Sequence, residues 1–227
     1  MKLSRFFLLG MMLAGALAGA PVYGAVAFVS TRADIHADDS LDWQVLGNNG
    51  TTVAQPFTLA TTTGARQVTV AKASAGAFRR VDQGDGWNGN FTHGDALLWT
   101  DGTAGPISLT FDLPVRAVGM QIQKSDQTNP SFTARIEAFD SADNSLGAFS
   151  ADGTSNANAD GSALFMGVSS SLQDIARVEI TEIWGEDFAV NWVSIHIPES
   201  RSGPLMLAAA ALFVLRLRSL SRRSRPH

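Results

Sequence analysis

The sequence predicts an all-β protein, and within that class an antiparallel β-sandwich of the jelly-roll type. Three observations support this prediction. Apolar and polar residues alternate in several runs between residues 25 and 197, as they do in half-buried strands. Turn-forming residues interrupt these runs at short intervals. Charged residues make up only 17% of the chain, which also holds 21 glycines and 8 prolines, and this composition excludes a coiled coil.

The predicted strands follow one another from residue 26 to residue 197. The strongest alternation lies in Ile107–Leu113, Val118–Ile122, Phe132–Ala138 and Val178–Ile180. Phe188–Ile197 is apolar on both faces, which predicts a central strand. Earlier strands are expected at Val26–Ser30, Asp42–Leu46, Pro56–Thr61, Gln67–Lys72, Ala77–Val81 and Ala96–Thr100. Turns are expected at Gly47–Gly50, Gln83–Gly86, Asp101–Gly102, Asp140–Asn144 and Asp152–Gly153, and a polar loop at Thr154–Gly161.

Charge is distributed unevenly along the chain. The whole sequence carries a formal net charge of −4, but two basic residues precede residue 25 and six follow residue 200. Residues 25–200 therefore hold nine basic residues against all 21 acidic ones, a net charge of about −12. An acidic body repels phosphate backbones, so we expect no nucleic-acid partner. The sequence contains no cysteine, which excludes disulfides, thiolate metal sites and thiol nucleophiles.

The first 24 residues are typical of a secretory signal peptide. Lys2 and Arg5 supply a basic start, and Phe6–Leu17 is a run of apolar or small residues. Alternating small residues then match the pattern that signal peptidase cuts, either after Ala18 or nearer Gly24. We therefore expect export across the inner membrane, and a body that spans residues 25–197.

Residues 198–227 carry a second hydrophobic segment. Leu205–Leu215 is an unbroken apolar run, which gives about 17 Å of helix at ~1.5 Å per residue and is shorter than a hydrocarbon core of ~30 Å. Five arginines follow this run: Arg216, Arg218, Arg222, Arg223 and Arg225. Their charge predicts a cytoplasmic tail. We expect a short transmembrane helix that anchors the protein transiently, although a permanent anchor stays open as an alternative.

This order of features resembles the PEP-CTERM family: a signal peptide, a β-rich body, a Pro-Glu step, a short apolar helix and a terminal arginine cluster. The family motif is Pro-Glu-Pro, which Pro198 and Glu199 match and from which Ser200 departs. The resemblance implies a bacterial exported protein whose C-terminal signal is processed by an exosortase-type membrane peptidase. From about Trp43 to Ile195 the body also looks like the sandwich domain often found ahead of this signal, which implies a fold and no activity.

The sequence contains none of the common catalytic motifs. It has no Gly-x-Ser-x-Gly elbow, no His-Glu-x-x-His zinc motif, no P-loop and no dinucleotide fingerprint. Acid pairs such as Glu179 with Glu182 are expected by chance on an acidic surface and do not specify a glycosidase. We therefore expect a non-enzymatic protein without catalytic residues or an organic cofactor.

Calcium is the one metal for which the sequence offers candidate ligands. The segment Asp82–Asn90 interleaves oxygen-bearing side chains with glycines, which would let the chain wrap tightly around a hard cation. The candidate ligands are Asp82, Asp85, Asn88 and Asn90. A turn that uses glycine and asparagine at positive φ explains the same residues, so both interpretations stay open.

Two tryptophans next to glycines are candidate glycan-binding residues. Trp87 and Trp184 fall in predicted loops, where an exposed ring could stack on a sugar face. Trp87 would form a platform with its polar neighbours, unless it folds back as a lid on the core. The expected function is thus an exported, non-enzymatic surface or matrix protein associated with exopolysaccharide. The alternatives are a carbohydrate-binding module built on the Trp87 loop or, with less support, a glycan-active enzyme.

Overall fold

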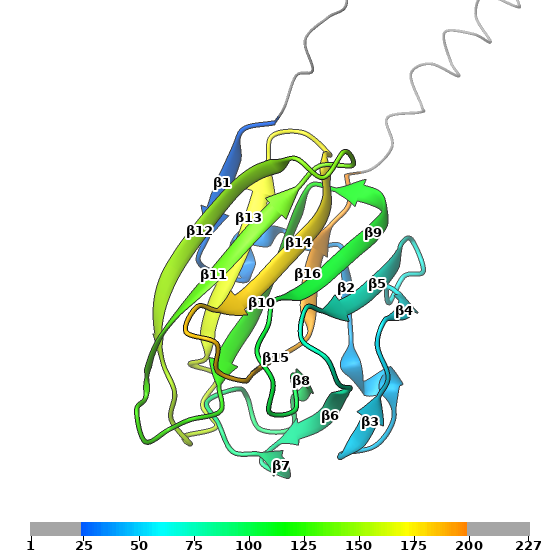
Figure 1. Cartoon of the computed structure of the whole chain (residues 1–227). Helices are drawn as coiled ribbons and strands as arrows, with labels where there is room; N and C mark the ends of the chain where they lie inside the picture. Colours follow the sequence, from blue (N-terminus) through cyan, green and yellow to red (C-terminus); the bar gives the residue numbers. More distant parts are fainter. Residues whose placement is uncertain (1–23, 199–227) are drawn as a thin grey trace, which may run out of the picture.

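The computed structural model describes residues 24–198, and these form two β-sheets that pack face to face in a sandwich-like arrangement (Figure 1). Two short 3-10 helices, η1 (Ala33–Ile35) and η2 (Trp43–Leu46), are the only helical elements of this part of the chain. All strand pairs are antiparallel except one. The prediction of an all-β protein is therefore confirmed.

The first sheet is the larger one and branches at β10. Its main path runs through β1 (Val26–Val29), β13 (Leu164–Ser170), β10 (Ala117–Lys124), β15 (Phe188–Val190), β8 (Ala96–Trp99), β6 (Phe78–Gln83) and β3 (Thr51–Val53). Off this path, β16 (Val193–His196) pairs with β10 and with β2 (Asp39–Leu41), and β7 (Gly86–Trp87) pairs in parallel with β6.

The second sheet has six strands and no branch. Its order is β12 (Ser145–Thr154), β11 (Ser131–Phe139), β14 (Ile175–Glu182), β9 (Ile107–Val115), β5 (Gln67–Lys72) and β4 (Phe57–Ala60). Most predicted strands coincide with these elements within a residue or two, because period-two alternation places one side of each strand in the core.

The main core lies between the two sheets. Val118, Met120 and Ile122 of β10 face alternate residues of the second sheet, such as Ile136 and Ile180, and all five side chains are fully buried. The first sheet is also covered on its outer face, where Trp87, Phe91 and Leu97 belong to a separate buried cluster. Burial on both faces explains why β15 is apolar throughout, with all three of its residues buried.

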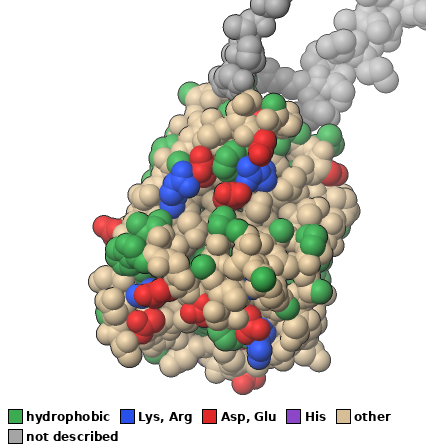
Figure 2. All heavy atoms as spheres, in the orientation of Figure 1, with side chains coloured by type: hydrophobic (Ala, Val, Ile, Leu, Met, Phe, Trp, Pro, Cys, Tyr) green, Lys and Arg blue, Asp and Glu red, His purple; other side chains and the backbone are tan. Residues whose placement is uncertain are grey.

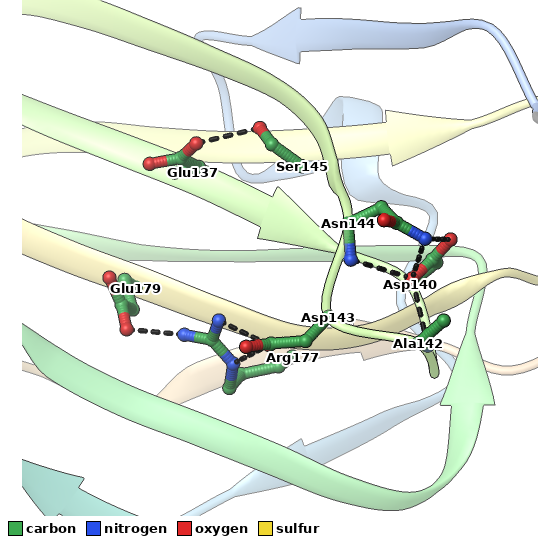
Figure 3. A network of polar contacts seen from close by, with 8 residues as sticks. All are labelled: Glu137, Asp140, Ala142, Asp143, Asn144, Ser145, Arg177 and Glu179. Carbon is green, nitrogen blue, oxygen red and sulfur yellow. Dashed lines mark hydrogen bonds and ion pairs between the residues drawn. The ribbon is translucent and has the colours of Figure 1, made fainter.

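The outer face of the second sheet is polar. Figure 2 shows charged side chains of both signs lying together on this face of the molecule. At one end of it, the guanidinium of Arg177 bridges the carboxylates of Asp143 and Glu179, while Asp140 accepts hydrogen bonds within the β11–β12 turn (Figure 3). These contacts tie that turn to β14. Each exposed ion pair contributes at most about 1 kcal/mol, so their effect is local.

Three predicted elements are wrong. Residues Trp43–Leu46, expected in a strand, form η2, because Asp42 caps it by accepting a hydrogen bond from the Gln44 backbone N–H at 2.9 Å. The predicted strand Phe188–Ile197 is broken into β15 and β16 at Asn191. The predicted turn at Asp152–Gly153 lies inside β12, where Gly153 makes room for the ring of Phe132; a Cβ there would lie 2.4 Å from the ring.

The two predicted hydrophobic segments fall outside the described residues. This applies to the signal peptide before Gly24, to the helix Leu205–Leu215 and to the arginine tail, together with Glu199 of the sorting motif; Pro198 is the last residue described. Between residues 24 and 198, no helix is long and apolar enough to cross a membrane.

Candidate functional site

The residues predicted as calcium ligands begin at the end of β6, where the chain turns sharply. Gly84 and Gly86 have φ angles of +93° and +128°, which other residues rarely adopt, and the Asp85 backbone N–H donates to the Asp82 carbonyl at 3.2 Å. The side chain of Asn49, which lies just before β3, accepts a hydrogen bond from the Asp82 backbone N–H at 3.0 Å. The turn is therefore held against a segment more than 30 residues earlier in the chain.

A polar groove of about 520 Å³ lies between these two segments. It is lined by Gln44, Val45, Gly47, Asn48, Asn49, Arg80, Asp82, Gln83, Asp85, His93 and Gly94. Arg80 is only 4% exposed, and its Nη1 lies 2.6 Å from Oδ1 of Asp82. Asp82 is thus neutralised within the protein, whereas Asp85 is exposed. Side-chain amides, an imidazole and carboxylates are groups that hydrogen-bond to hydroxyl-rich ligands.

The structure does not bring the four predicted calcium ligands together. Asp82 and Asp85 line the groove, whereas Asn88 is exposed elsewhere and Asn90 is buried with its amide donating to the Thr154 carbonyl at 3.2 Å. In residues 24–198 there is no group of three or more histidine or acidic side chains placed to hold a metal ion. Calcium binding stays a prediction; Asn90 does not line the groove with Asp82 and Asp85, and its Nδ2 donates to the Thr154 carbonyl and the Ser162 hydroxyl.

Trp87 is a lid on the core. Its indole is 6% exposed, packs edge-on against Trp99 at 5.8 Å between ring centroids, and donates through Nε1 to Oε1 of Gln123 at 3.3 Å. The predicted sugar platform on Trp87 is therefore wrong, because both ring faces are covered by protein. Of the alternatives drawn from the sequence, the lid interpretation describes this residue.

Trp184 is exposed, as predicted, with 60% of its surface open to solvent. It lies in the turn between β14 and β15, which a buried acid holds in shape. Glu182 is 2% exposed, and its Oε2 accepts hydrogen bonds from the backbone N–H groups of Trp184 at 2.9 Å and Glu186 at 3.0 Å. Gly185 completes the turn at a φ of +85°. The exposed indole thus projects from a turn whose backbone is held by the buried carboxylate of Glu182.

Two further acids fasten the end of this turn to β10 and β8. Nζ of Lys124, a fully buried side chain, lies 3.0 Å from Oε2 of Glu186. Asp187 accepts hydrogen bonds from the Ser125 hydroxyl and from Nε1 of Trp99, the latter at 2.7 Å. The Ser125 backbone N–H also donates to the Asp187 carbonyl at 3.0 Å. The polar loop of residues 125–130 therefore lies beside the Trp184 turn, at the same end of the two sheets (Figure 1).

A second buried polar network lies on the outer face of the first sheet, where Asn191 separates β15 from β16. Oδ1 of Asn191 accepts hydrogen bonds from the Gln121 backbone N–H at 3.0 Å and from Nη2 of Arg32 at 2.9 Å, and Nδ2 donates to Gln121 and Asp95. The Arg32 guanidinium stacks on Trp192 at 3.6 Å from the ring centroid. Burial lowers the pKa of Arg32 to about 10, and the charge of Asp95 opposes this effect. Arg32 remains charged at neutral pH.

Several residues of these sites could not be identified from the sequence. Glu182 was expected by chance on an acidic surface, yet it is buried, and Glu186, to which the sequence assigned no role, neutralises Lys124. One local pattern could have indicated the role of Glu182. It lies two and four residues before Trp184 and Glu186, whose backbone N–H groups it binds in a turn that contains glycine. Gln44, Asn48 and Asn49 give no such indication, because only strand pairing brings them to the groove.

Comparisons with known proteins do not identify the chain. No protein family model matches it, and no curated protein matches it. Among solved structures, the chain is similar to a DUF4465 family protein from Bacteroides caccae, with 12% sequence identity and a TM-score of 0.42. That match covers 74% of this chain and 99% of the other. A likeness at this level supports no inference about function.

Proposed function

We propose that the protein is an exported, non-enzymatic surface or matrix protein that carries a PEP-CTERM-type sorting signal and associates with exopolysaccharide. Signal peptidase would remove the first 18–24 residues, and an exosortase-type peptidase would act near Pro198 and Glu199 after transient anchoring in the inner membrane. We further propose that the two packed sheets form a jelly-roll-type antiparallel sandwich. Support for the sorting part comes from the residues quoted above; support for the binding part comes from the geometry that follows.

The observation that carries this proposal is that the ends of the described chain and the Trp184 turn lie at opposite ends of β14. Before β14, the Asp174 carboxylate accepts a hydrogen bond from the Gly24 backbone N–H at 2.7 Å, and Gln173 lines a small pocket together with Ile197 and Pro198. Both ends of the described chain thus leave from the beginning of β14. The Trp184 turn lies at its other end, about 26 Å away for eight residues of strand. A protein attached through its C-terminus would therefore present Trp184 away from the attachment.

The sorting part is tested by intact mass of the protein recovered from membrane and extracellular fractions. The expected extracellular species lacks both the signal peptide and everything after about Glu199. A membrane species that retains Arg216–His227, with no shortened form outside the cell, would mean that the tail is a permanent anchor, and the surface proposal would then be wrong.

The binding part is tested by the substitution Trp184→Ala. We expect retention on exopolysaccharide purified from the producing cells to weaken about tenfold, because an aromatic contact contributes up to ~1.5 kcal/mol and 1.4 kcal/mol corresponds to a factor of ten. Trp184→Phe should keep most of the retention, since a phenyl ring can still stack.

Leu172→Ala is the matched control for the loss of an exposed apolar side chain. Leu172 is 41% exposed and lies just before β14, at the end where the chain termini leave. Retention should not change in this variant. If Trp184→Ala binds as well as Leu172→Ala does, the turn is not the glycan contact, and the polar groove beside Asp85 becomes the next position to test.

A further inference from the structure

One strand of the described domain has a long free edge. β12 is the last strand of the second sheet and has ten residues, and it pairs only with β11. The other terminal strands of the two sheets and of their branches have two to four residues each: β1, β2, β3, β4 and β7. Short edge strands offer little to pair with, whereas a long one presents a row of backbone groups without partners. Figure 1 shows the open side of β12 along one border of the molecule.

β12 lacks most of the features that protect edge strands. Its sequence, Ser145–Thr154, contains no lysine, arginine or proline, and Asp152 is its only charged residue. One register shift lies near Ser145, opposite Phe139. After it, residues 147–154 pair regularly with β11 over eight positions. This regular stretch is about 26 Å long at ~3.3 Å per residue, and it is open to a further strand.

Among residues 24–198, the backbone on the open side of β12 has one partner, at its last residue, where the Thr154 carbonyl accepts a hydrogen bond from Nδ2 of Asn90 at 3.2 Å. In an antiparallel pair, N–H and C=O groups point alternately toward the partner and away from it, so half of those of β12 point outward. β1 of the other sheet lies nearby, with the Phe28 and Phe149 rings 5.8 Å apart between centroids, but no ladder of hydrogen bonds joins β1 to β12. The rings meet on the core side, which leaves the edge itself free.

We propose that a second copy of this chain pairs with β12 in antiparallel orientation, so that the second sheets of two molecules become one continuous sheet. A strand can pair with its own copy about a two-fold axis, and each contact then occurs twice. Because Asp152 is the only charge, it faces a neutral residue in every such register except the one centred on Asp152 itself. The small outward side chains of Ala148 and Ser150 leave room for the incoming strand.

The strength of this pairing is limited by charge and by area. Each body carries a net charge of about −12, so two copies repel one another at low ionic strength. A single pair of strands also buries less surface than a standard protein interface. The dimer should therefore form best at high local concentration and at physiological salt or above. This inference does not depend on the sugar-binding proposal.

The chain has no native cysteine, so a single introduced cysteine can form a disulfide only with another molecule. We would place one cysteine at a time at residues 148–152 in the full-length chain, expressed in cells that export it into an oxidising compartment. The residue on the two-fold axis faces its own copy at a Cα–Cα distance of about 4.5–5.5 Å, which suits a disulfide, whereas a residue two positions away is too far from its own copy.

The expected result is a disulfide-linked dimer that peaks at one position, at least tenfold above Thr69→Cys. Thr69 is equally exposed but lies on β5, between two other strands. If the axis falls on Phe149 and that variant does not fold, mixing Ala148→Cys with Ser150→Cys gives the peak instead. Equal cross-linking at all positions, or no more than at Thr69→Cys, would overturn the proposal.

A second pair of variants uses charge and needs no disulfide. Ala148→Lys with Ser150→Lys should abolish the dimer seen by sedimentation, because lysines on an edge oppose strand addition. Thr69→Lys with Thr110→Lys adds the same charge at exposed positions of two interior strands and should leave the dimer intact. The inference is wrong if both double variants associate equally, or if the unchanged protein is monomeric at every salt concentration.

Discussion

Replacing Asn191 by alanine is expected to lower the free energy of unfolding by about 3–5 kcal/mol, among the largest effects of a single substitution. The side chain is 1% exposed and makes four hydrogen bonds, two with Gln121, one with Arg32 and one with Asp95. Alanine leaves these half-buried partners unpaired, and each unpaired group costs up to about 1–3 kcal/mol. The guanidinium of Arg32 loses one of its contacts with the β15–β16 break and keeps its hydrogen bond to the Trp192 carbonyl at 3.1 Å. Urea denaturation followed by tryptophan fluorescence measures the change.

The matched control is Asn144→Ala. Asn144 also hydrogen-bonds to a carboxylate, that of Asp140, but it lies in an exposed turn where water replaces the lost contact (Figure 3). We expect a loss of less than about 1 kcal/mol there. If the two substitutions lower the free energy of unfolding equally, the Asn191 network does not stabilise the fold as described.

Replacing Glu186 by glutamine is expected to cost about 3 kcal/mol and to loosen the turn that presents Trp184. The substitution leaves the ammonium of Lys124, which is fully buried, without the carboxylate 3.0 Å from it. Removal of one partner from a fully buried ion pair costs about 3–5 kcal/mol because the remaining charge is uncompensated, and the lower end applies here because the Glu186 side chain is 34% exposed. The free energy of unfolding is again measured by urea denaturation. Retention on exopolysaccharide is measured as well, and it should decrease because the turn that carries Trp184 becomes less ordered.

A second substitution shows whether the buried charge is the cause. Lys124→Met added to Glu186→Gln should restore most of the lost stability, since neither member of the pair then carries a charge. Glu137→Gln, which breaks the more exposed pair with Arg135, should change the free energy of unfolding by no more than about 1 kcal/mol. A double variant as unstable as Glu186→Gln alone would contradict this explanation.

Strands with a buried face could be predicted from the sequence, and the edge of the second sheet could not. β5 coincides with its prediction because its alternate residues are valines that must leave water. β12 was missed, and part of it was assigned to a turn. Its outward residues are small, and Gly153 is a glycine only because the Phe132 ring occupies the space of a side chain. That constraint is tertiary and leaves no local pattern.

The candidate site, like the fold, could be predicted from the sequence only in part. Asp82 and Asp85 were identified because they lie in one turn, but the other wall of the groove comes from Gln44 and Asn49, which β3–β6 pairing brings there. Trp87 and Trp184 each have one glycine neighbour, Gly86 before the first and Gly185 after the second, so the sequence could not separate the buried ring from the exposed one. The difference arises from what lies beneath each loop.

The position of β16 bears on how the domain would respond to a pull. Its last residues lead directly to Pro198, while β10 and β2 flank it on both sides in antiparallel pairs. Traction between a ligand at the Trp184 turn and a tether beyond Pro198 would run nearly along the strand axis. The hydrogen bonds of β16 would then be loaded together in shear and could not open one after another. Such a domain would resist detachment forces at a cell surface better than its net stability alone implies.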